Sequence, residues 1–429
     1  MTKLGKEMHD LANVLFPICR SLTGEGVRET LKIISRKIPI KINEVPTGTK
    51  VFDWSVPKEW NIRDAYIITP DGEKICEFKK KNLHVLGYST PINKLISLNE
   101  LQDHLYSIPN QPDAIPYVTS YYDERWGFCI SHKDRLKLVD GVYHVFIDSY
   151  LEDGSLTYGE LIIPGETNKE VFLSTYVCHP SMANNELSGP VVTIALAKFI
   201  KALKNRRYTY RIIFIPETIG SIVYLNKNLY HLKEHVDAGF NITCIGDERC
   251  YSYLPSRHGN TLSDKVALHV LKHTDRNFKS YTWLDRGSDE RQYCAPGVDL
   301  PIATIMRSKY GEYPEYHTSL DDLCLVTPSG LEGGYKALKK AIEIIEKNTY
   351  PRINVLGEPQ LGKRGLYPTL STKKSGVKVR KMMDFISFCD GKHSLLEIAE
   401  LINTPFHDLL EIMEKLVEKR LMSVTVDEE

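Results

Sequence analysis

VFLSTYVCHPSMANNELSGPVVTIALAKFIKAL, residues 171–203, contains the transition that decides the fold. Its opening VFLSTYV predicts a buried strand, and LSGPVVTIALAKFIKAL has the apolar spacing of a helix over 188–204. Ser188 can cap that helix, and Pro190 suits its first turn. A buried strand that passes through a polar turn into a long helix is typical of an α/β protein.

The same alternation continues toward the C-terminus. Further strands are predicted at 210–216, 239–246 and 301–308, and further helices from about 219, at 260–274 and at 329–347. Strands that alternate with helices imply a parallel or mixed sheet with helices on both faces.

The segments before residue 165 differ in character. Residues 8–38 have helical spacing broken at SLTGEG (21–26), which predicts two helices joined by a turn. From about 51 to 161, short strand-like runs alternate with turn signals such as TPDGEK and LEDGSL. We therefore expect an N-terminal helical part (1–50), a mostly β inserted domain (51–164) and a main α/β domain (165–350).

A small helical unit is predicted at the C-terminus. Residues 351–376 contain Pro, Gly and Lys and predict a linker, so the last domain is a linker with a winged helix at 351–429. Ser394 to Glu397 is a capping-box pattern, and LMSVTV predicts a final strand. The intervening helix has an apolar face made of Phe406, Leu409, Leu410, Met413, Leu416 and Val417.

Composition excludes several classes of partner. The chain has 429 residues, 42% of them hydrophobic, and Lys plus Arg equals Asp plus Glu at 55 each. A net charge of zero offers no electrostatic attraction to nucleic acid or anionic membranes. The start has no signal-peptide pattern, and nine scattered cysteines without C-x-x-C indicate reduced thiols. We expect a cytoplasmic protein with no nucleic-acid or membrane partner.

Polar residues follow the predicted strands. His179, Glu186, Glu217, Asp247 and His317 all lie in such fragments. Ligand sites in α/β sheets form where strand ends meet helix starts, and neutral imidazoles with carboxylates suit zinc. Each residue alone is more often structural, so the prediction depends on the joint pattern.

The order of these motifs resembles the zinc-dependent aminopeptidases with an α/β/α exopeptidase sandwich fold, over roughly residues 165–348. The resemblance implies that His179 is the first metal histidine and that NNELSG (184–189) is the bridging segment. It also implies that Glu217 of PETIGS is the base, that GSDERQY (287–293) is a substrate-side loop, and that His317 of YHTSLDD is the last ligand.

A narrower resemblance covers nearly the whole chain. CRSLTGEGVRETL, FDWSVPKEWNIRDAYI, CHPSMANNELSG and DRGSDERQY look like a bacterial aminopeptidase-like subfamily linked to surface-polysaccharide biosynthesis. Members of that subfamily combine an inserted β domain with a C-terminal winged helix, so the resemblance implies the same organisation here, with residues 1–50 belonging to the exopeptidase domain.

The chain departs from the family pattern at three carboxylate positions. Asn185 takes the place of the bridging Asp, Thr218 that of the second Glu, and Thr243 that of the later Asp. A neutral amide is a poor bridging ligand, so we expect one zinc per chain rather than two. Ser181 also replaces an acid that follows the first histidine in the family.

The expected ligands of this zinc are His179, Glu186 and His317, the composition of an open catalytic site. Glu186 is chosen over Asn185 because it is charged. Asp247, four residues past Thr243, either compensates for a missing ligand or caps a turn.

Glu217 is expected to be the general base, and Tyr316 is expected to donate a hydrogen bond to the oxyanion. Asp289 or Glu290 would hold a free amino group of the substrate and Arg291 a carboxylate. Internal ion pairing among these three residues is an equally good interpretation.

Two functions fit these features. The first is a metallo-aminopeptidase-like hydrolase that cleaves an amide in a peptide or an amino-acid-modified sugar; the second is a degenerate exopeptidase fold that serves as a binding or assembly module. A transcription factor is disfavoured because the helix PFHDLLEIMEKLVEKR is rich in Asp and Glu. Homo-oligomerisation and the physiological substrate are left open.

Overall fold

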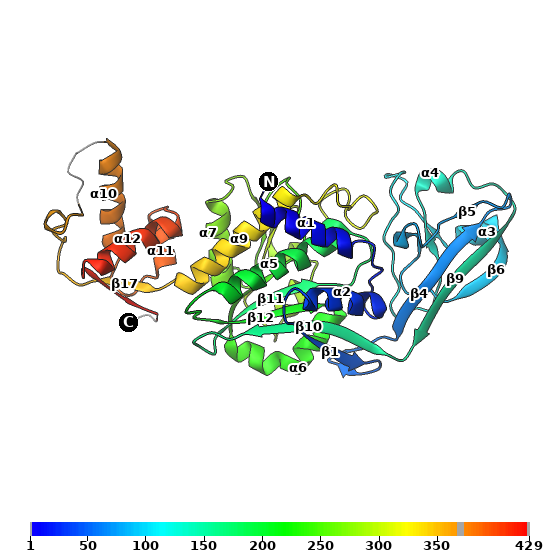
Figure 1. Cartoon of the computed structure of the whole chain (residues 1–429), viewed down its shortest axis with the longest axis horizontal. Coiled ribbons are helices and arrows are strands. Elements are labelled where there is room, and N and C mark those ends of the chain that lie inside the picture. The colour runs from blue at the N-terminus through cyan, green and yellow to red at the C-terminus, as the bar shows by residue number, and fades with distance from the viewer. Residues whose placement is uncertain (1, 367–372, 427–429) are drawn as a thin grey trace. The chain divides into compact units, whose positions relative to one another are not determined.

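The computed structural model describes residues 2–366 and 373–426 (Figure 1). The chain packs as two units, residues 1–264 with 277–338 and residues 265–276 with 339–429. Across the described ranges, no helix has both the length and the apolar character needed to cross a bilayer.

The first unit is built on an eight-stranded mixed sheet. Its strand order is β1–β10–β12–β11–β13–β16–β14–β15, and the neighbouring strands β12, β11, β13 and β16 are parallel. The bounds are β1 Lys41–Pro46, β10 Ser155–Ile163, β11 Glu170–Tyr176, β12 Thr209–Ile215, β13 Val236–Asn241, β14 Ser252–Leu254, β15 Lys279–Ser280 and β16 Ile302–Met306. All residues of β11 are buried, as the apolar run predicts for a central parallel strand.

Helices cover this sheet. In the first unit these are α1 at Lys3–Leu15, α2 at Glu25–Ser35, α5 at Ser188–Ala202, α6 at Ile219–His235 and α8 at Glu290–Tyr293. Two more helices, α7 at Leu262–Lys272 and α9 at Pro328–Lys347, run from the first unit into the second. In Figure 1, α1 and α5 lie on one side of the sheet and α6 on the other. The α/β sandwich and the two N-terminal helices are therefore confirmed.

The segment between β1 and β10 is mostly β. Its main feature is a four-stranded antiparallel sheet of order β5–β4–β9–β6. Its strands are β4 Glu59–Ile68, β5 Lys74–Ile75, β6 Ile92–Ser97 and β9 Val142–Glu152, with the short pairs β2 Lys50–Val51 and β3 Trp54–Ser55, and β7 Leu105–Tyr106 and β8 Phe128–Cys129. Short helices are α3 Leu98–Gln102 and α4 His132–Arg135, with the 3-10 turn η1 Asn82–His84; the 3-10 turn η3 Trp283–Asp285 lies elsewhere in the first unit. β10 pairs with β12 of the main sheet. The predicted end of the inserted domain at residue 164 stays a prediction.

The second unit is a winged helix. It contains β17 Tyr350–Ile353, η4 Gly362–Arg364, α10 Lys373–Ile386, α11 Leu395–Leu401, α12 Phe406–Glu418 and β18 Met422–Thr425. The capping box of Ser394 and Glu397 is formed, and β17 pairs with β18. The prediction that Val417 belongs to the buried face of α12 is wrong, because its side chain is 41% exposed. Residues 367–372 of the expected linker lie outside the described residues.

Candidate metal and catalytic site

The candidate site lies at the carboxyl ends of the parallel strands. His179 follows β11, Glu217 follows β12, and His317 lies in the long loop after β16. Because these strands are parallel neighbours, their carboxyl ends meet at one edge of the sheet. The rings of His179 and His317 lie with their centroids 5.5 Å apart, so the topology brings the two predicted histidines together.

A π-helical turn, η2 (Ala183–Leu187), connects the first strand end to α5. The predicted cap at Ser188 is wrong: its hydroxyl donates to the carbonyl oxygen of Asn184 at 2.6 Å, within a helical path that has already begun. Single π-turns are frequent at functional sites because they turn side chains away from the regular helical positions. Here the turn carries Asn185 and Glu186.

Asp321 holds the start of this turn and was not predicted. Its carboxylate accepts backbone N–H groups of Ala183, Asn184 and Asn185 at 3.2, 2.6 and 2.9 Å, and the Tyr313 hydroxyl at 2.9 Å. Burial raises the pKa of Asp321 to about 6, although these donors favour the charged form. The only signal in the sequence was an acidic residue four positions after His317.

Glu186 binds the Nδ1 side of His179. Its Oε2 lies 2.9 Å from His179 Nδ1, and its Oε1 accepts a hydrogen bond from Arg20 Nε at 3.2 Å. Arg20 Nε also donates to the His179 carbonyl oxygen at 2.9 Å, and the side chains of Arg20 and Glu186 are fully buried. A carboxylate in this position fixes the tautomer in which Nδ1 is protonated, which leaves Nε2 as the ligand atom.

This contact also sets the charge of His179. Burial opposes protonation of the ring, but the hydrogen bond and the charge of Glu186 outweigh it, so the pKa of His179 is raised. Ser181 does not supply the orienting group, because its hydroxyl donates to the carbonyl oxygen of Phe16 at 2.7 Å. The geometry thus gives Glu186 the contacts of an orienting residue, and its predicted role as a direct ligand stays a prediction.

The Nε2 side of His179 faces Glu217 and His317. Glu217 Oε2 lies 3.7 Å from His179 Nε2. His317 Nε2 is buried and, among the described residues, has no hydrogen-bond partner. Burial, together with the charge of His179, lowers the pKa of His317 to about 3. The ring is therefore neutral at physiological pH, the form in which imidazole binds a metal.

Glu217 directly precedes a residue with a strained backbone. Its Oε1 accepts the Ser288 hydroxyl at 2.8 Å, and burial raises the pKa of its carboxyl group. The next residue, Thr218, has φ 64° and ψ −78°, a rare conformation for a β-branched residue, and its N–H donates to Asp289 Oδ1 at 2.7 Å. Strain of this kind is concentrated at functional sites, where the surrounding structure enforces it.

The three charged residues of the predicted substrate loop have different environments. Asp289 and Glu290 are fully buried, whereas Arg291 is exposed. Burial and the neighbouring charge of Glu217 raise the pKa of Asp289 to about 8. Within the described part of the chain, Arg291 forms no ion pair with either acid; its Nη2 donates to Thr218 Oγ1 at 2.6 Å.

Neutral groups surround Asn185 and Thr243, two of the positions at which the resemblance to zinc aminopeptidases would imply a carboxylate. The Tyr176 hydroxyl lies 3.2 Å from Asn185 Oδ1 and 2.5 Å from Thr243 Oγ1. Asp247 does not take over a ligand role: its oxygens accept hydrogen bonds from the Asn184 side chain, the Ser308 N–H and hydroxyl and the Arg249 N–H. The chemistry of this donor set does not fit a second divalent ion.

The segment between β7 and β8 contributes a wall that the sequence did not reveal. The Tyr117 ring contacts both histidine rings edge-on, each at a centroid distance of 5.2 Å, and its N–H donates to the His317 carbonyl oxygen at 2.8 Å. Tyr316 stacks on His317 at 3.9 Å, and burial with the nearby charge of Glu217 raises the pKa of its hydroxyl. The candidate oxyanion donor therefore lies beside the candidate base.

Two groups of three side chains in the described residues have the spacing of metal ligands. One is Cys178, His179 and Glu186, where the buried Arg20 guanidinium would repel a cation. The other is His269, His273 and Glu400, in which His269 already uses Nδ1 with Glu400 at 2.5 Å and Nε2 with the Phe406 N–H at 2.9 Å. Hydrogen bonding accounts for both groups.

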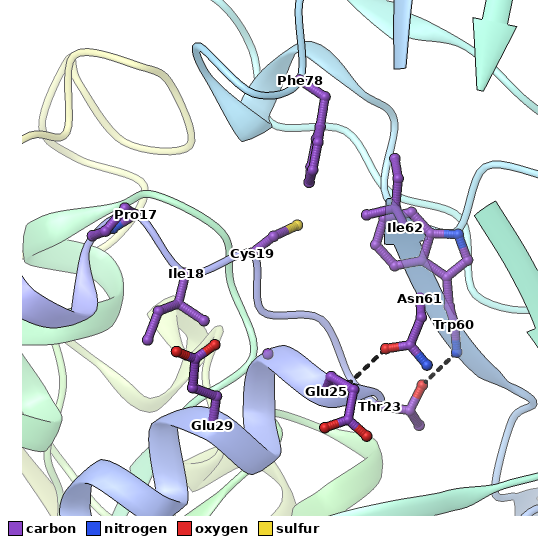
Figure 2. Close-up of a pocket in the computed structure, with 11 residues that line it drawn as sticks. Pro17, Ile18, Cys19, Thr23, Glu25, Glu29, Trp60, Asn61, Ile62 and Phe78 are labelled. Carbon is purple, nitrogen blue, oxygen red and sulfur yellow. Dashed lines mark hydrogen bonds between the residues drawn. The ribbon is translucent and has the colours of Figure 1, made fainter. Parts of the chain in front are cut away.

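A separate pocket of about 410 Å³ lies between the α1–α2 connection and the start of β4 (Figure 2). Ile18, Ile62 and Phe78 give it apolar walls. Two of its polar side chains are hydrogen-bonded: Asn61 Oδ1 accepts the Glu25 N–H at 2.7 Å, and Thr23 Oγ1 accepts the Trp60 N–H at 3.1 Å. No histidine is among the described residues that line it, so the strand-end site remains the candidate metal site.

Comparison with known proteins identifies the family of the chain. Residues 9–348 match the family described as a domain of unknown function, DUF4910. The chain belongs to the DUF4910 family. Residues 348–424 of this DUF4910 protein also match a winged helix-turn-helix family, as predicted.

Relatives of this DUF4910 protein carry peptidase descriptions. A Clostridium acetobutylicum protein with the working name "polysaccharide biosynthesis protein with aminopeptidase-like domain" is 46% identical over 400 residues, which cover 93% of this chain and 92% of the relative. A crystal structure of a peptidase candidate from the same species is 44% identical, with a TM-score of 0.92 and coverage of 98% and 96%. The predicted relationship to the aminopeptidase-like subfamily is confirmed.

The fold extends to more distant enzymes. The zinc aminopeptidase of Bacillus subtilis is 12% identical, with a TM-score of 0.56, and the match covers 80% of this chain and 94% of that chain. At this identity the similarity shows the exopeptidase fold alone.

Proposed function

We propose that this DUF4910 protein is a hydrolase of the aminopeptidase-like type that uses one divalent metal, zinc by preference, to cleave an amide bond. The observation that carries the proposal is the pair of imidazole rings 5.5 Å apart, with Glu217 Oε2 3.7 Å from His179 Nε2. Two nitrogen donors would supply part of the ligand set of a catalytic zinc, and the neighbouring carboxylate is placed to serve as its base. The substrate would be a peptide or an amino-acid-modified sugar.

His179 and His317 would hold the ion, and Glu186 would orient His179 through Nδ1. When bound, the ion supplies Lewis-acid polarisation of the carbonyl group and of a water molecule. We assign Glu186 the orienting role because both of its oxygens are already bonded inside the protein. Its predicted role as the third ligand is the alternative, and the metal affinity of a Glu186 variant distinguishes the two.

Glu217 would act as general base. Its raised pKa makes the Glu217 carboxylate a stronger base, because a general base works best when its pKa lies near the operating pH. The Ser288 hydroxyl fixes the orientation of the carboxylate. Glu217 accepts a proton from water, the water oxygen bonds to the carbonyl carbon, and the proton passes to the leaving nitrogen as the C–N bond breaks. The Tyr316 hydroxyl would donate to the oxyanion of the tetrahedral stage.

The test combines metal analysis with one substitution. Protein purified without chelator should contain one zinc or similar ion per chain, and Glu217→Gln should retain it while losing hydrolysis by about 100-fold or more. Glu234→Gln, an exposed change at the far end of α6, is the matched control and should behave as the wild type. Loss of the metal along with activity would make Glu217 a ligand, which the 3.7 Å distance also permits. Two tightly bound ions per chain would contradict the proposal.

The second candidate function is a catalytically inactive binding or assembly module. The neutral contacts among Tyr176, Asn185 and Thr243 favour it, because they replace carboxylates of the active family with uncharged groups. The strained Thr218 next to Glu217 argues for the enzyme instead, since a scaffold has no evident need for strain at a base position.

A further inference from the structure

The exposed charge of the substrate loop (287–293) has the sign opposite to that needed to bind a free amino terminus. An enzyme that selects a free amine requires an accessible carboxylate beside the scissile bond. In this protein the two acidic residues of the substrate loop are buried, and the exposed charge is a cation. We infer that the site selects amides with a carboxylate next to the scissile bond, as in N-acyl amino acids, and that Arg291 binds this carboxylate. The inference rests on the proposed hydrolytic function.

Asp289 is hydrogen-bonded inside the protein. Its Oδ1 accepts the Thr218 N–H at 2.7 Å and the Ser221 hydroxyl at 2.9 Å, which fixes the strained start of α6. Its Oδ2 has no hydrogen-bond partner among the described residues and is buried, so it presents no charge to solvent. Asp289 thus stabilises the base-bearing turn and offers no accessible charge.

Glu290 is hydrogen-bonded in the same way. Its Oε1 accepts the N–H groups of Gly287 and Ser288, each at 2.9 Å, and the Tyr310 hydroxyl at 2.5 Å. Its Oε2 accepts the Asn241 side-chain amide at 2.9 Å. With these four donors the carboxylate is fully hydrogen-bonded, so it cannot bind a substrate ammonium group without breaking the loop.

Arg291 alone of the three presents its charge to the site. Its Nη2 donates to Thr218 Oγ1, which places the guanidinium beside the residue that follows Glu217. Its charge acts on both Glu217 and Tyr316, where it partly opposes the burial that raises the pKa of each group. In the described part of the chain, no carboxylate lies within ion-pair distance of it. A guanidinium has five N–H donors in a planar fork that matches a carboxylate, so most of its donors remain for a ligand.

Substrate charge should therefore decide selectivity. A substrate ammonium group beside Arg291 would meet a like charge, whereas a carboxylate would gain a charge-assisted, bidentate contact. Hydrolysis of an N-acyl amino acid breaks the C–N bond, adds the water oxygen to the acyl carbon, and releases a carboxylic acid and an amino acid. The carboxylate that Arg291 holds leaves with the amine product.

The experiment compares two compounds with the same scissile amide, N-acetylphenylalanine and N-acetylphenylalaninamide, in metal-loaded full-length protein. We expect kcat/KM to be higher for the carboxylate, and Arg291→Gln to reduce the ratio of the two values by about 10- to 100-fold. Arg291→Lys should restore only part of the ratio, because an ammonium lacks the planar fork. Arg286→Gln, an exposed arginine of the same loop that stacks on Trp283, should leave the ratio unchanged.

Equal kcat/KM values for the two compounds in the wild type, or a ratio that Arg291→Gln does not change, would overturn the inference. Phenylalanine anilide, which carries a free amine, is the third compound, and a preference for it would likewise overturn the inference. Calorimetric binding of N-acetylphenylalanine to Glu217→Gln, with and without Arg291→Gln, separates the two claims. Arg291-dependent binding without any turnover would sink the proposed hydrolysis and leave the carboxylate site supported.

Discussion

Replacing Arg20 with methionine should destabilise the first unit far more than the loss of a surface charge would. Arg20 and Glu186 have no exposed side-chain surface, and their Nε–Oε1 distance is 3.2 Å. Arg20 also donates to the carbonyl oxygens of Leu15 and His179. Arg20→Met removes the only Arg or Lys that pairs with Glu186 among the described residues, and breaking a buried pair from one side costs about 3–5 kcal/mol.

Thermal melting followed by circular dichroism measures this effect. For a cooperative unit of this size, each kcal/mol shifts the melting temperature by about 1.5 °C, so Arg20→Met should lower it by about 5–7 °C. The control is Arg63→Met, whose partner Asp148 lies 3.4 Å away and where the side chains are 69% and 38% exposed. Exposed pairs contribute about 0–1 kcal/mol, so the control should melt within about 2 °C of the wild type.

A double mutant tests the reason for the loss. If the cost comes from an unpaired buried charge, adding Glu186→Gln to Arg20→Met should recover stability, because glutamine keeps the shape of the side chain without its charge. A double mutant that is less stable than Arg20→Met alone, or an Arg20→Met variant that melts within 2 °C of the wild type, would refute the reasoning.

Three further predictions concern other parts of the chain. The pKa of Glu170 is lowered, because hydrogen bonds and charge from Arg211 and His231 outweigh the opposing effect of burial. The charged carboxylate therefore stabilises the fold above its unfolded pKa of about 4.5, and this contribution is lost as pH falls below that value. The stability difference between wild type and Glu170→Gln, measured by urea titration, should shrink from pH 7 to pH 3. Leu416→Ala should destabilise the winged helix by about 2–5 kcal/mol, because Leu416 is fully buried, while Val417→Ala should have little effect; equal losses would contradict the assigned face. Deleting Ile386 to Glu429 should change the oligomeric mass or the solubility of the protein in light scattering, without revealing a DNA-binding function; salt-dependent, sequence-specific duplex binding by that segment would oppose this.

The meeting of polar residues at the strand ends could be predicted because it depends on local sequence. The apolar run before His179 fixes β11, and the parallel order then brings the residues after β11 and β12 to one edge of the sheet. The family resemblance supplied the choice of Glu217 among many acidic residues. Both steps need only the residues next to each strand.

The residues that surround this chemistry could not be predicted, since their contacts are distant in sequence. Arg20 lies in the α1–α2 connection, and Tyr117 comes from the segment between β7 and β8. Arg20 lies in the subfamily motif CRSLTGEGVRETL, but neither residue has a local signal that ties it to the site. Only tertiary packing brings them there. The strand predicted at 239–246 ends at Asn241 because Thr243 turns to bond with Tyr176 and Cys244 adopts a positive φ of 47°.

The ends of the mostly β segment have an evolutionary consequence. Pro46 at the end of β1 pairs with Ser155 at the start of β10, and the Thr47 N–H donates to the Gly154 carbonyl oxygen at 2.9 Å. The segment thus leaves the main sheet and returns to it at a single point, where lengthening, shortening or exchange would disturb no strand of that sheet. Because the same segment supplies Tyr117 beside the histidines, natural selection can reshape what the site admits while the groups on the strand ends stay fixed.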